Sequence, residues 1–246
     1  MREGGIRLDV ALTMDSSTLL SKSECAVAIV DVLRATSTIT KAIDSGSGAL
    51  FPVAGIEVAR DLAGKLGDAL LCGERMGIKP EGFDLGNTPL EFSREKVSGR
   101  RIVLASTNGT KALARYSDSK ALIAASLLNA SAAADYLKAL REDIILVCAG
   151  QDGTFGAEDA ICAGLMIERL KETGTKFTMT DPGWAALTLY RACKNDIPGS
   201  VRQCDHAAYL IEEGFAEDVA YCSRVDILNS VPKAATIDGK LALIKA

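Results

Sequence analysis

Histidine is nearly absent from the chain: His206 is the single one among 246 residues. Metal sites that draw several histidines from one chain, such as those of zincins, are therefore excluded. No GxSxG elbow supplies a serine partner for His206, and no cysteine has an arginine six positions later, the spacing of a cysteine-dependent phosphatase loop. His206 stands at the start of an expected helix, where a local structural role is its favoured interpretation.

Sequence signals for several other ligand classes are also missing. GxxxxGK[ST] does not occur, and Gly46-Ser47-Gly48 lacks the third glycine of a dinucleotide fingerprint and precedes a strand. No apolar run approaches the roughly 18 residues of a membrane span. The net charge is -4 without a long basic run, which argues against nucleic acid as a partner. A small anionic ligand is still compatible with this charge, because a local basic pocket can form in an acidic protein.

The seven cysteines are scattered without a CxxC pair, and most stand among apolar residues. We interpret them as small buried apolar side chains in a reducing compartment. The first residues lead directly into a stretch in which apolar and polar residues alternate, and they contain no apolar signal-peptide segment. These features predict a cytoplasmic protein that does not bind membranes. A homo-oligomer is compatible with the sequence.

Apolar strand-like segments alternate with amphipathic helical segments as far as about residue 180. This alternation predicts an α/β fold, namely a three-layer α/β/α sandwich with a largely parallel or mixed central sheet. We expect strands at 6–12, 26–30, 49–53, 69–72, 102–105, 121–125 and 144–148, with helices that include 56–66, 130–140 and 157–171.

We expect a single domain over residues 1–246, less regular from about residue 180. Helical patterns at 184–193 and 207–213 precede short strands near 224–228 and 231–237. Val231-Pro232 indicates a sheet edge or a break, because proline cannot donate to a strand ladder. Asp238-Gly239 between apolar flanks predicts a hairpin.

Acidic side chains follow several of the expected strands. Ligands of open α/β sheets bind beyond the carboxyl ends of strands, so these positions are candidates for a shared site. Asp31, Glu74, Glu158 and Asp159 offer carboxylate oxygens, which suit Mg²⁺. Helix capping is the alternative for Asp31, and favourable first-turn charge is the alternative for Glu158 and Asp159.

Basic and hydroxyl side chains follow the strands as well. Thr107-Asn108-Gly109-Thr110-Lys111 comes after one strand and opens a helix, where backbone N–H groups and the positive helix end form an anion cradle. An ordinary helix cap with a surface lysine is the alternative. Arg34 and Arg75 are suited to bidentate contacts with phosphate or sulfonate, or are solvated surface residues.

The segment 73–88 shows no secondary-structure period. It combines four glycines and a proline with charges of both signs. Long irregular segments in compact domains are usually functional or disordered. Ile78, Phe83 and Leu85 offer apolar anchors, so we favour an ordered functional loop.

Four stretches together resemble the 2-phosphosulfolactate phosphatases of coenzyme M biosynthesis. They are Val30-Asp31-Val32-Leu33-Arg34-Ala35-Thr36-Ser37-Thr38, Gly73-Glu74-Arg75 through Asn87-Thr88-Pro89, Thr107-Asn108-Gly109-Thr110-Lys111, and Cys148-Ala149-Gly150 through Glu158-Asp159. The resemblance implies a three-layer α/β/α fold and a Mg²⁺-dependent hydrolysis of (R)-2-phospho-3-sulfolactate to 3-sulfolactate and phosphate.

The residues are compatible with this chemistry. The small anionic substrate carries about four negative charges near neutral pH, which call for cationic groups and a metal. Our hypothesis places Asp31, Glu158 and Asp159 around Mg²⁺, with Glu74 as a further candidate. Catalysis is assigned to Asp31, Arg34 and Glu74. Substrate binding is assigned to Arg75, Lys79, Thr107, Asn108, Gly109, Thr110 and Lys111, with Arg75 and Lys79 on the sulfonate or carboxylate.

Two mechanisms and two other functions stay open at this stage. Attack by metal-activated water is one mechanism, and an aspartyl-phosphate on Asp31 is its rival. Leu33 stands where the DxDx[TV] signature of haloacid dehalogenase-type phosphatases has its second acid, which disfavours the rival. The alternative functions are a Mg²⁺-dependent phosphatase of another small acidic phosphoester and a non-catalytic anion-binding protein.

Overall fold

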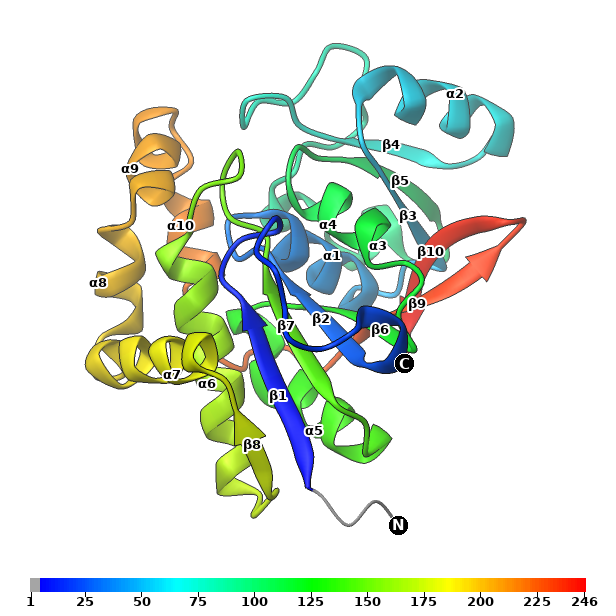
Figure 1. Ribbon diagram of the computed structural model, residues 1–246. Helices are drawn as coiled ribbons and strands as arrows, with labels where there is room; N and C mark the ends of the chain where they lie inside the picture. The colour runs from blue at the N-terminus through cyan, green and yellow to red at the C-terminus, as the bar shows by residue number, and fades with distance from the viewer. Residues whose placement is uncertain (1–4) are drawn as a thin grey trace.

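A computed structural model describes residues 5–246 (Figure 1). Residues 1–4 lie outside the described part. The prediction that the chain has no signal peptide rests partly on them. Within the described part, ten strands form one sheet in the order β4-β5-β3-β10-β9-β6-β2-β7-β1-β8. The strands are β1 (Ile6–Ala11), β2 (Ala26–Val30), β3 (Ala49–Val53), β4 (Leu70–Gly73), β5 (Arg101–Ala105), β6 (Ala121–Ala125), β7 (Ile144–Cys148), β8 (Phe177–Met179), β9 (Pro232–Ile237) and β10 (Lys240–Lys245). The α-helices are α1 (Ala35–Asp44), α2 (Ile56–Leu66), α3 (Arg94–Val97), α4 (Gly109–Arg115), α5 (Ala130–Leu140), α6 (Ala157–Glu172), α7 (Asp181–Cys193), α8 (Ile197–Arg202), α9 (Asp205–Glu212) and α10 (Ala216–Cys222).

Two blocks of parallel strands make up most of the sheet. The larger block contains β8, β1, β7, β2 and β6, and the smaller one contains β3, β5 and β4. The antiparallel hairpin β9–β10 lies between them. It pairs Lys233 with Ile123 of the larger block and Leu243 with Leu50 of the smaller one. The hairpin therefore joins the blocks into the mixed sheet that the sequence predicted.

Helices α1 and α4 lie against one face of this sheet, which we call the inner face, and strands of both blocks pack against them (Figure 1). One apolar cluster joins Ile39 of α1 and Leu113 of α4 to Val27 of β2, Leu50 of β3 and Leu104 of β5. Because strands from both blocks contact the same two helices, the sheet wraps around them. The wrapping brings the carboxyl ends of the two blocks toward one another.

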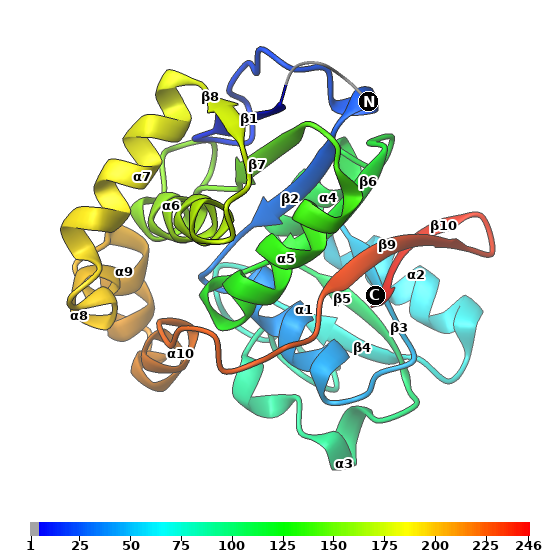
Figure 2. The same cartoon turned by 90° about the horizontal axis from the view of Figure 1, so that it is seen from below.

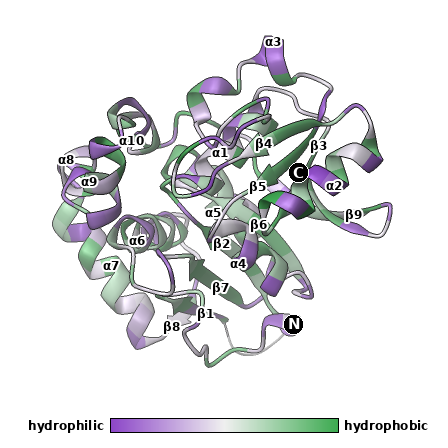
Figure 3. Ribbon diagram, turned by 90° about the horizontal axis from the view of Figure 1, so that it is seen from above, coloured by the Kyte–Doolittle hydropathy of each residue, from purple (hydrophilic) through white to green (hydrophobic). Residues whose placement is uncertain are grey.

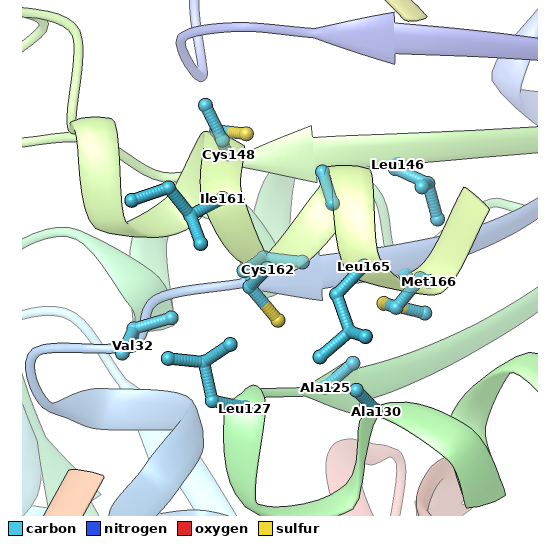
Figure 4. Packing of buried hydrophobic residues seen from close by; sticks show 14 of the residues in the cluster. Val32, Ala125, Leu127, Ala130, Leu146, Cys148, Ile161, Cys162, Leu165 and Met166 are labelled. Carbon is cyan, nitrogen blue, oxygen red and sulfur yellow. The ribbon is translucent and has the colours of Figure 1, made fainter. Parts of the chain in front are cut away.

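Other helices cover the outer face. Helices α5 and α6 lie across β2 and β7, with α7 beside them (Figure 2). Leu165 of α6 packs near Ala125 of β6, next to Leu146 of β7 (Figure 4). Helix α2 covers the smaller block through Ala59 and Leu62. Apolar residues concentrate in the central strands, and polar residues on the surrounding helices and loops (Figure 3). The expected three-layer α/β/α arrangement is confirmed.

The regular part of the chain follows the sequence pattern closely. Helices α2 and α5 have the expected bounds. Six cysteines are buried and Cys193 is half-buried, as their apolar surroundings predicted. No helix within residues 5–246 has the length and apolar character that crossing a bilayer requires. The single-domain interpretation stays a prediction.

Two expectations for the later part of the chain are wrong. Residues 224–228 form no strand, and instead the backbone N–H groups of Asp226 and Leu228 bond carbonyls in the segment that leads into α5. Val231-Pro232 marks no sheet edge, because Pro232 opens β9 in the interior of the sheet. The first residue of a strand is a position that tolerates proline. The Asp238-Gly239 hairpin is confirmed.

The central position of the hairpin makes Leu243 a test of the fold. Its side chain is fully buried among residues of β2, β5 and α1. Leu243→Ala is expected to lower the free energy of unfolding by about 2–5 kcal/mol, because it leaves a cavity in the inner core. Urea denaturation measures this, with exposed Lys240→Ala on the same strand as the control. Equal stability of the two variants would contradict the inserted hairpin.

Candidate active site

A cavity of about 310 Å³ lies at the carboxyl ends of the strands; we call it the central cavity. Its walls come from residues that follow β2, β4, β5 and β7, and from α9. Helix α9 lies at the carboxyl end of the strands (Figure 1). The predicted site residues on these walls are Asp31, Arg34, Glu74, Thr107 and Asn108. Strand ends from both blocks thus meet in one place, as the sequence analysis expected.

Asp31 directly follows β2 and is almost completely buried in the cavity wall. Its Oδ1 accepts a hydrogen bond of 3.0 Å from the backbone N–H of Ala35 at the start of α1. The backbone of Gly109, which opens α4, also hydrogen-bonds this carboxyl. A Cβ at position 109 would lie 2.6 Å from Oδ2 of Asp31, so glycine is required for the approach. Asp31 is thereby fixed between the first residues of two helices.

The surroundings of Asp31 disfavour its charged form. Burial raises the pKa of Asp31 to about 7, and the Ala35 and Gly109 backbone groups only partly oppose this. The negative charges of Glu158 and Glu74 contribute to the same upward shift. An aspartate with a pKa near neutrality can hold or release a proton under physiological conditions.

Asp159 stands in the first turn of α6 and connects two loops of the site. Its Oδ1 accepts a hydrogen bond of 2.8 Å from the Val32 backbone, and its Oδ2 accepts one of 3.0 Å from the Gly150 backbone. The segments after β2 and β7 are therefore fixed relative to each other. Burial, followed by the charges of Glu158 and Asp31, raises the pKa of Asp159 well above its usual range.

Glu158 completes a buried group that we call the acidic triad, Asp31, Glu158 and Asp159. Its Oε2 is buried without a hydrogen-bond partner within residues 5–246. Burial raises the pKa of Glu158, and the backbone N–H of Glu158 itself, followed by the Cys204 side chain, only partly opposes the shift. Within residues 5–246, no member of the triad forms an ion pair with a basic side chain. The three carboxyl groups are therefore buried without a partner of opposite charge.

The donors of the acidic triad suit Mg²⁺. They are hard carboxylate oxygens, and Oε2 of Glu158 has no hydrogen-bond partner within residues 5–246. Of the three side chains, Asp31 lines the central cavity, whereas Glu158 and Asp159 are buried behind its wall. No group of three or more His, Cys, Asp or Glu side chains in the described chain surrounds a single metal position. Mg²⁺ does not require such a cage, since it commonly uses one or two carboxylates together with waters and substrate phosphate.

Arg34 lies on the cavity wall but is held by the protein itself. Its Nη1 donates to Oδ2 of Asp218 in α10, at 2.5 Å, and both side chains are about 2% exposed. Its Nη2 donates to the Gly77 carbonyl at 2.6 Å. The guanidinium also lies over the ring of Phe215, 4.1 Å from the centroid. These contacts present Arg34 to the cavity in a fixed orientation.

Glu74 connects the loop after β4 to the loop after β5. Its Oε1 accepts hydrogen bonds from the backbone and hydroxyl of Thr107, at 2.9 and 3.0 Å. Its Oε2 accepts one of 2.8 Å from the Gly77 backbone. Phe83 and Leu85 are buried, so the loop 73–88 is anchored as expected, whereas Ile78 is 53% exposed and is no anchor.

The segment 107–111, predicted to bind an anion of the substrate, contacts a carboxyl group of the protein, that of Asp31. Its Gly109 end contacts the Asp31 carboxyl, so the helix start faces an internal anion. Thr110 is fully buried, and its hydroxyl donates to the Ser106 carbonyl at 2.6 Å. Thr107 and Asn108 remain on the cavity wall. Substrate contact by Gly109 and Thr110 stays a prediction.

A second hollow of about 250 Å³, the side cavity, adjoins the central one and shares four lining residues with it, namely Glu74, Met76, Ser106 and Thr107. Arg75 and Lys111 line it, and neither forms an ion pair within residues 5–246. They therefore offer free positive charge next to the central cavity. Lys79 is exposed and lines neither cavity.

Sequence reasoning missed several cavity residues. It favoured a local structural role for His206, but the structure places this side chain on the central cavity wall. Tyr209 also lines the cavity, and Asp218 pairs with Arg34. All three residues lie in the less regular part of the chain, where no motif distinguished them.

The raised pKa of Asp31 makes a prediction for stability. Between pH 4 and 7 the folded protein retains a proton that the unfolded chain loses, so wild-type stability falls as pH rises through this window. Asp31→Asn removes this penalty. The stability difference between the variant and the wild type in metal-free buffer should therefore grow by about 1–4 kcal/mol from pH 4 to pH 8. Denaturant unfolding measures it, and a pH-independent difference would contradict the burial of a protonated Asp31.

Comparison with known proteins places the chain in a family. Residues 12–236 match the family described as 2-phosphosulpholactate phosphatase. A probable 2-phosphosulfolactate phosphatase of Thermotoga petrophila is 45% identical over 213 residues, covering 86% of this chain and 90% of that protein. Proteins of the same description from Carboxydothermus hydrogenoformans (40% over 225 residues, 92% of each chain) and Synechocystis (37% over 217 residues, 87% and 90%) are also similar. The chain belongs to the 2-phosphosulpholactate phosphatase family.

Proposed function

We propose that the protein is a Mg²⁺-dependent phosphatase that hydrolyses (R)-2-phospho-3-sulfolactate to 3-sulfolactate and phosphate. The descriptions of its relatives support the substrate and the reaction class. The structure supplies a cavity of suitable size at the ends of four strands, with fixed polar groups on its walls.

The observation that carries the metal requirement is the charge of the central cavity. Three carboxyl side chains, those of Asp31, Glu74 and Asp152, line it against a single guanidinium, that of Arg34. The Arg34 charge is already paired with Asp218. A substrate with about four negative charges would be repelled by such walls. A divalent cation reverses this balance.

Mg²⁺ would be held by Asp31 and Glu158, with Asp159 fixing the loops around them. When bound there, the ion supplies the positive charge that offsets the phosphoryl oxygens and makes the attacking water more acidic. Asp31 is oriented for this role by the Ala35 N–H. Asn108, in the segment after β5, offers its side-chain amide N–H groups to phosphoryl oxygens, whereas the Thr107 hydroxyl already donates to Glu74.

Arg75 and Lys111 are proposed to attract the remaining anionic groups of the substrate. They line the side cavity without carboxylate partners, so their charge is not neutralised by the protein. Arg34 keeps a fixed guanidinium at the central cavity. The positive charge of the site therefore comes from Arg34, which the protein holds in one orientation, and from Arg75 and Lys111, which no ion pair fixes.

The metal requirement is tested by phosphate release from (R)-2-phospho-3-sulfolactate across a Mg²⁺ titration after chelation. Activity should be lost with the chelator and return with Mg²⁺. Asp31→Asn should abolish turnover while near-native circular dichroism shows an intact fold. Activity that stays flat across the titration would contradict the metal role, and comparable turnover of unrelated phosphomonoesters would contradict the substrate assignment.

Arg75→Gln and Lys111→Gln provide a separate test of substrate attraction. Each should raise KM severalfold with a smaller change in kcat, because the lost charge acts on the anionic substrate rather than on bond cleavage. The increase should shrink at high salt, since screening weakens the wild-type attraction. Lys171→Gln, an exposed lysine at the end of α6, is the matched control. An unchanged KM in both variants would remove the side cavity from substrate binding.

A further inference from the structure

His206 lies on the part of the central cavity wall that helix α9 forms, away from the residues that follow the strands. It stands in the first turn of α9 and is half-buried. One turn further along, the hydroxyl of Tyr209 donates to the Met76 carbonyl at 3.0 Å and connects α9 to the loop after β4. The backbone position of His206 is therefore fixed relative to Glu74 and the rest of the cavity.

The imidazole itself is uncommitted. Neither ring nitrogen of His206 forms a hydrogen bond or ion pair with any residue from 5 to 246. The centroid of its ring lies 6.4 Å from that of the Tyr209 ring. A structural histidine normally has a hydrogen-bond partner when buried in a wall. Free ring nitrogens that face a cavity are suited to contact a bound molecule.

The groups that face His206 come from three other elements. They are Arg34 at the start of α1, Glu74 after β4 and Asp152 after β7; on its own helix, Asp205 is exposed. Burial and the Arg34 charge lower the pKa of His206, while Glu74 and Asp152 partly oppose this. A phosphate dianion in the cavity adds negative charge, which favours the protonated imidazole.

Hydrolysis of an alkyl phosphoester needs a proton at the departing alcohol oxygen, because an alkoxide is a poor leaving group. The other cavity groups are less suited to supply it. Asp31 is the proposed ligand of Mg²⁺, and a carboxylate that binds a metal ion must be deprotonated. Arg34 keeps its protons at all physiological pH values. The Tyr209 hydroxyl is committed to Met76, and both Glu74 oxygens already accept hydrogen bonds.

We propose that His206 is the general acid that protonates the departing alcohol oxygen, an inference that rests on the proposed phosphatase function. As water bonds to phosphorus, the phosphorus–oxygen ester bond breaks and its electron pair stays on the alcohol oxygen. That oxygen takes the imidazolium proton. The water protons stay on the phosphoryl oxygens, giving dihydrogen phosphate, which returns one proton to the imidazole or to solvent.

The kinetic test compares His206→Gln with Glu212→Gln, an exposed substitution on the same helix. His206→Gln should lower kcat for (R)-2-phospho-3-sulfolactate by about 10²-fold or more. It should also abolish the alkaline decline of the kcat–pH profile, a change that a purely structural role would not produce. Glu212→Gln should keep that decline. Wild-type kcat, or an alkaline decline that persists, in folded His206→Gln would overturn the proposal.

A second measurement is independent of turnover. Because His206 is the single histidine, tag-free protein labelled with ¹⁵N-histidine gives one imidazole spin system. Titration with inorganic phosphate in the presence of Mg²⁺ should shift its ring resonances and raise its pKa. If the protein hydrolyses no phosphoester, the proposed function fails, yet this titration still reports whether an anion reaches the imidazole. Ring resonances that do not respond to phosphate would overturn the proposed contact.

Discussion

Burial of the three carboxyl groups of the acidic triad is the constraint on which the site depends. Asp31, Glu158 and Asp159 are buried at the ends of β2 and at the start of α6, and the charged form of each is disfavoured by burial. Backbone N–H groups stabilise two of them, and the third keeps an unpartnered oxygen. The folded chain thus gathers three acidic groups in a place where either bound protons or an added cation must neutralise their charge.

The sheet creates this concentration through its construction in two blocks. Each block alone would present its strand ends on its own edge. The β9–β10 hairpin joins them, and α1 and α4 pack against both. Gly109 at the start of α4 then reaches the Asp31 carboxyl, while Glu74 and Thr107 connect the loops after β4 and β5. The packing of both blocks against α1 and α4 therefore also assembles the central cavity.

The sequence predicted those parts of the protein that local chemistry determines. Buried strands such as β2 and β7 are continuous apolar runs, and polar residues at their ends indicated where a ligand would bind. It could not predict the inserted hairpin, because the partners of Lys233 and Leu243 depend on long-range pairing. For the same reason it missed Asp218, which lies 184 positions from its partner Arg34. His206 escaped recognition since one histidine on a helix has no spacing pattern.

A crystal structure with Mn²⁺ in place of Mg²⁺, together with 3-sulfolactate and phosphate, tests the central claim most directly. Anomalous scattering would locate the cation without ambiguity. The account predicts a cation about 2.0–2.3 Å from an oxygen of Asp31, with the phosphate on its cavity side and a Glu158 oxygen turned toward it. A cation bound elsewhere, with the acidic triad unchanged and the phosphate outside the central cavity, would contradict it.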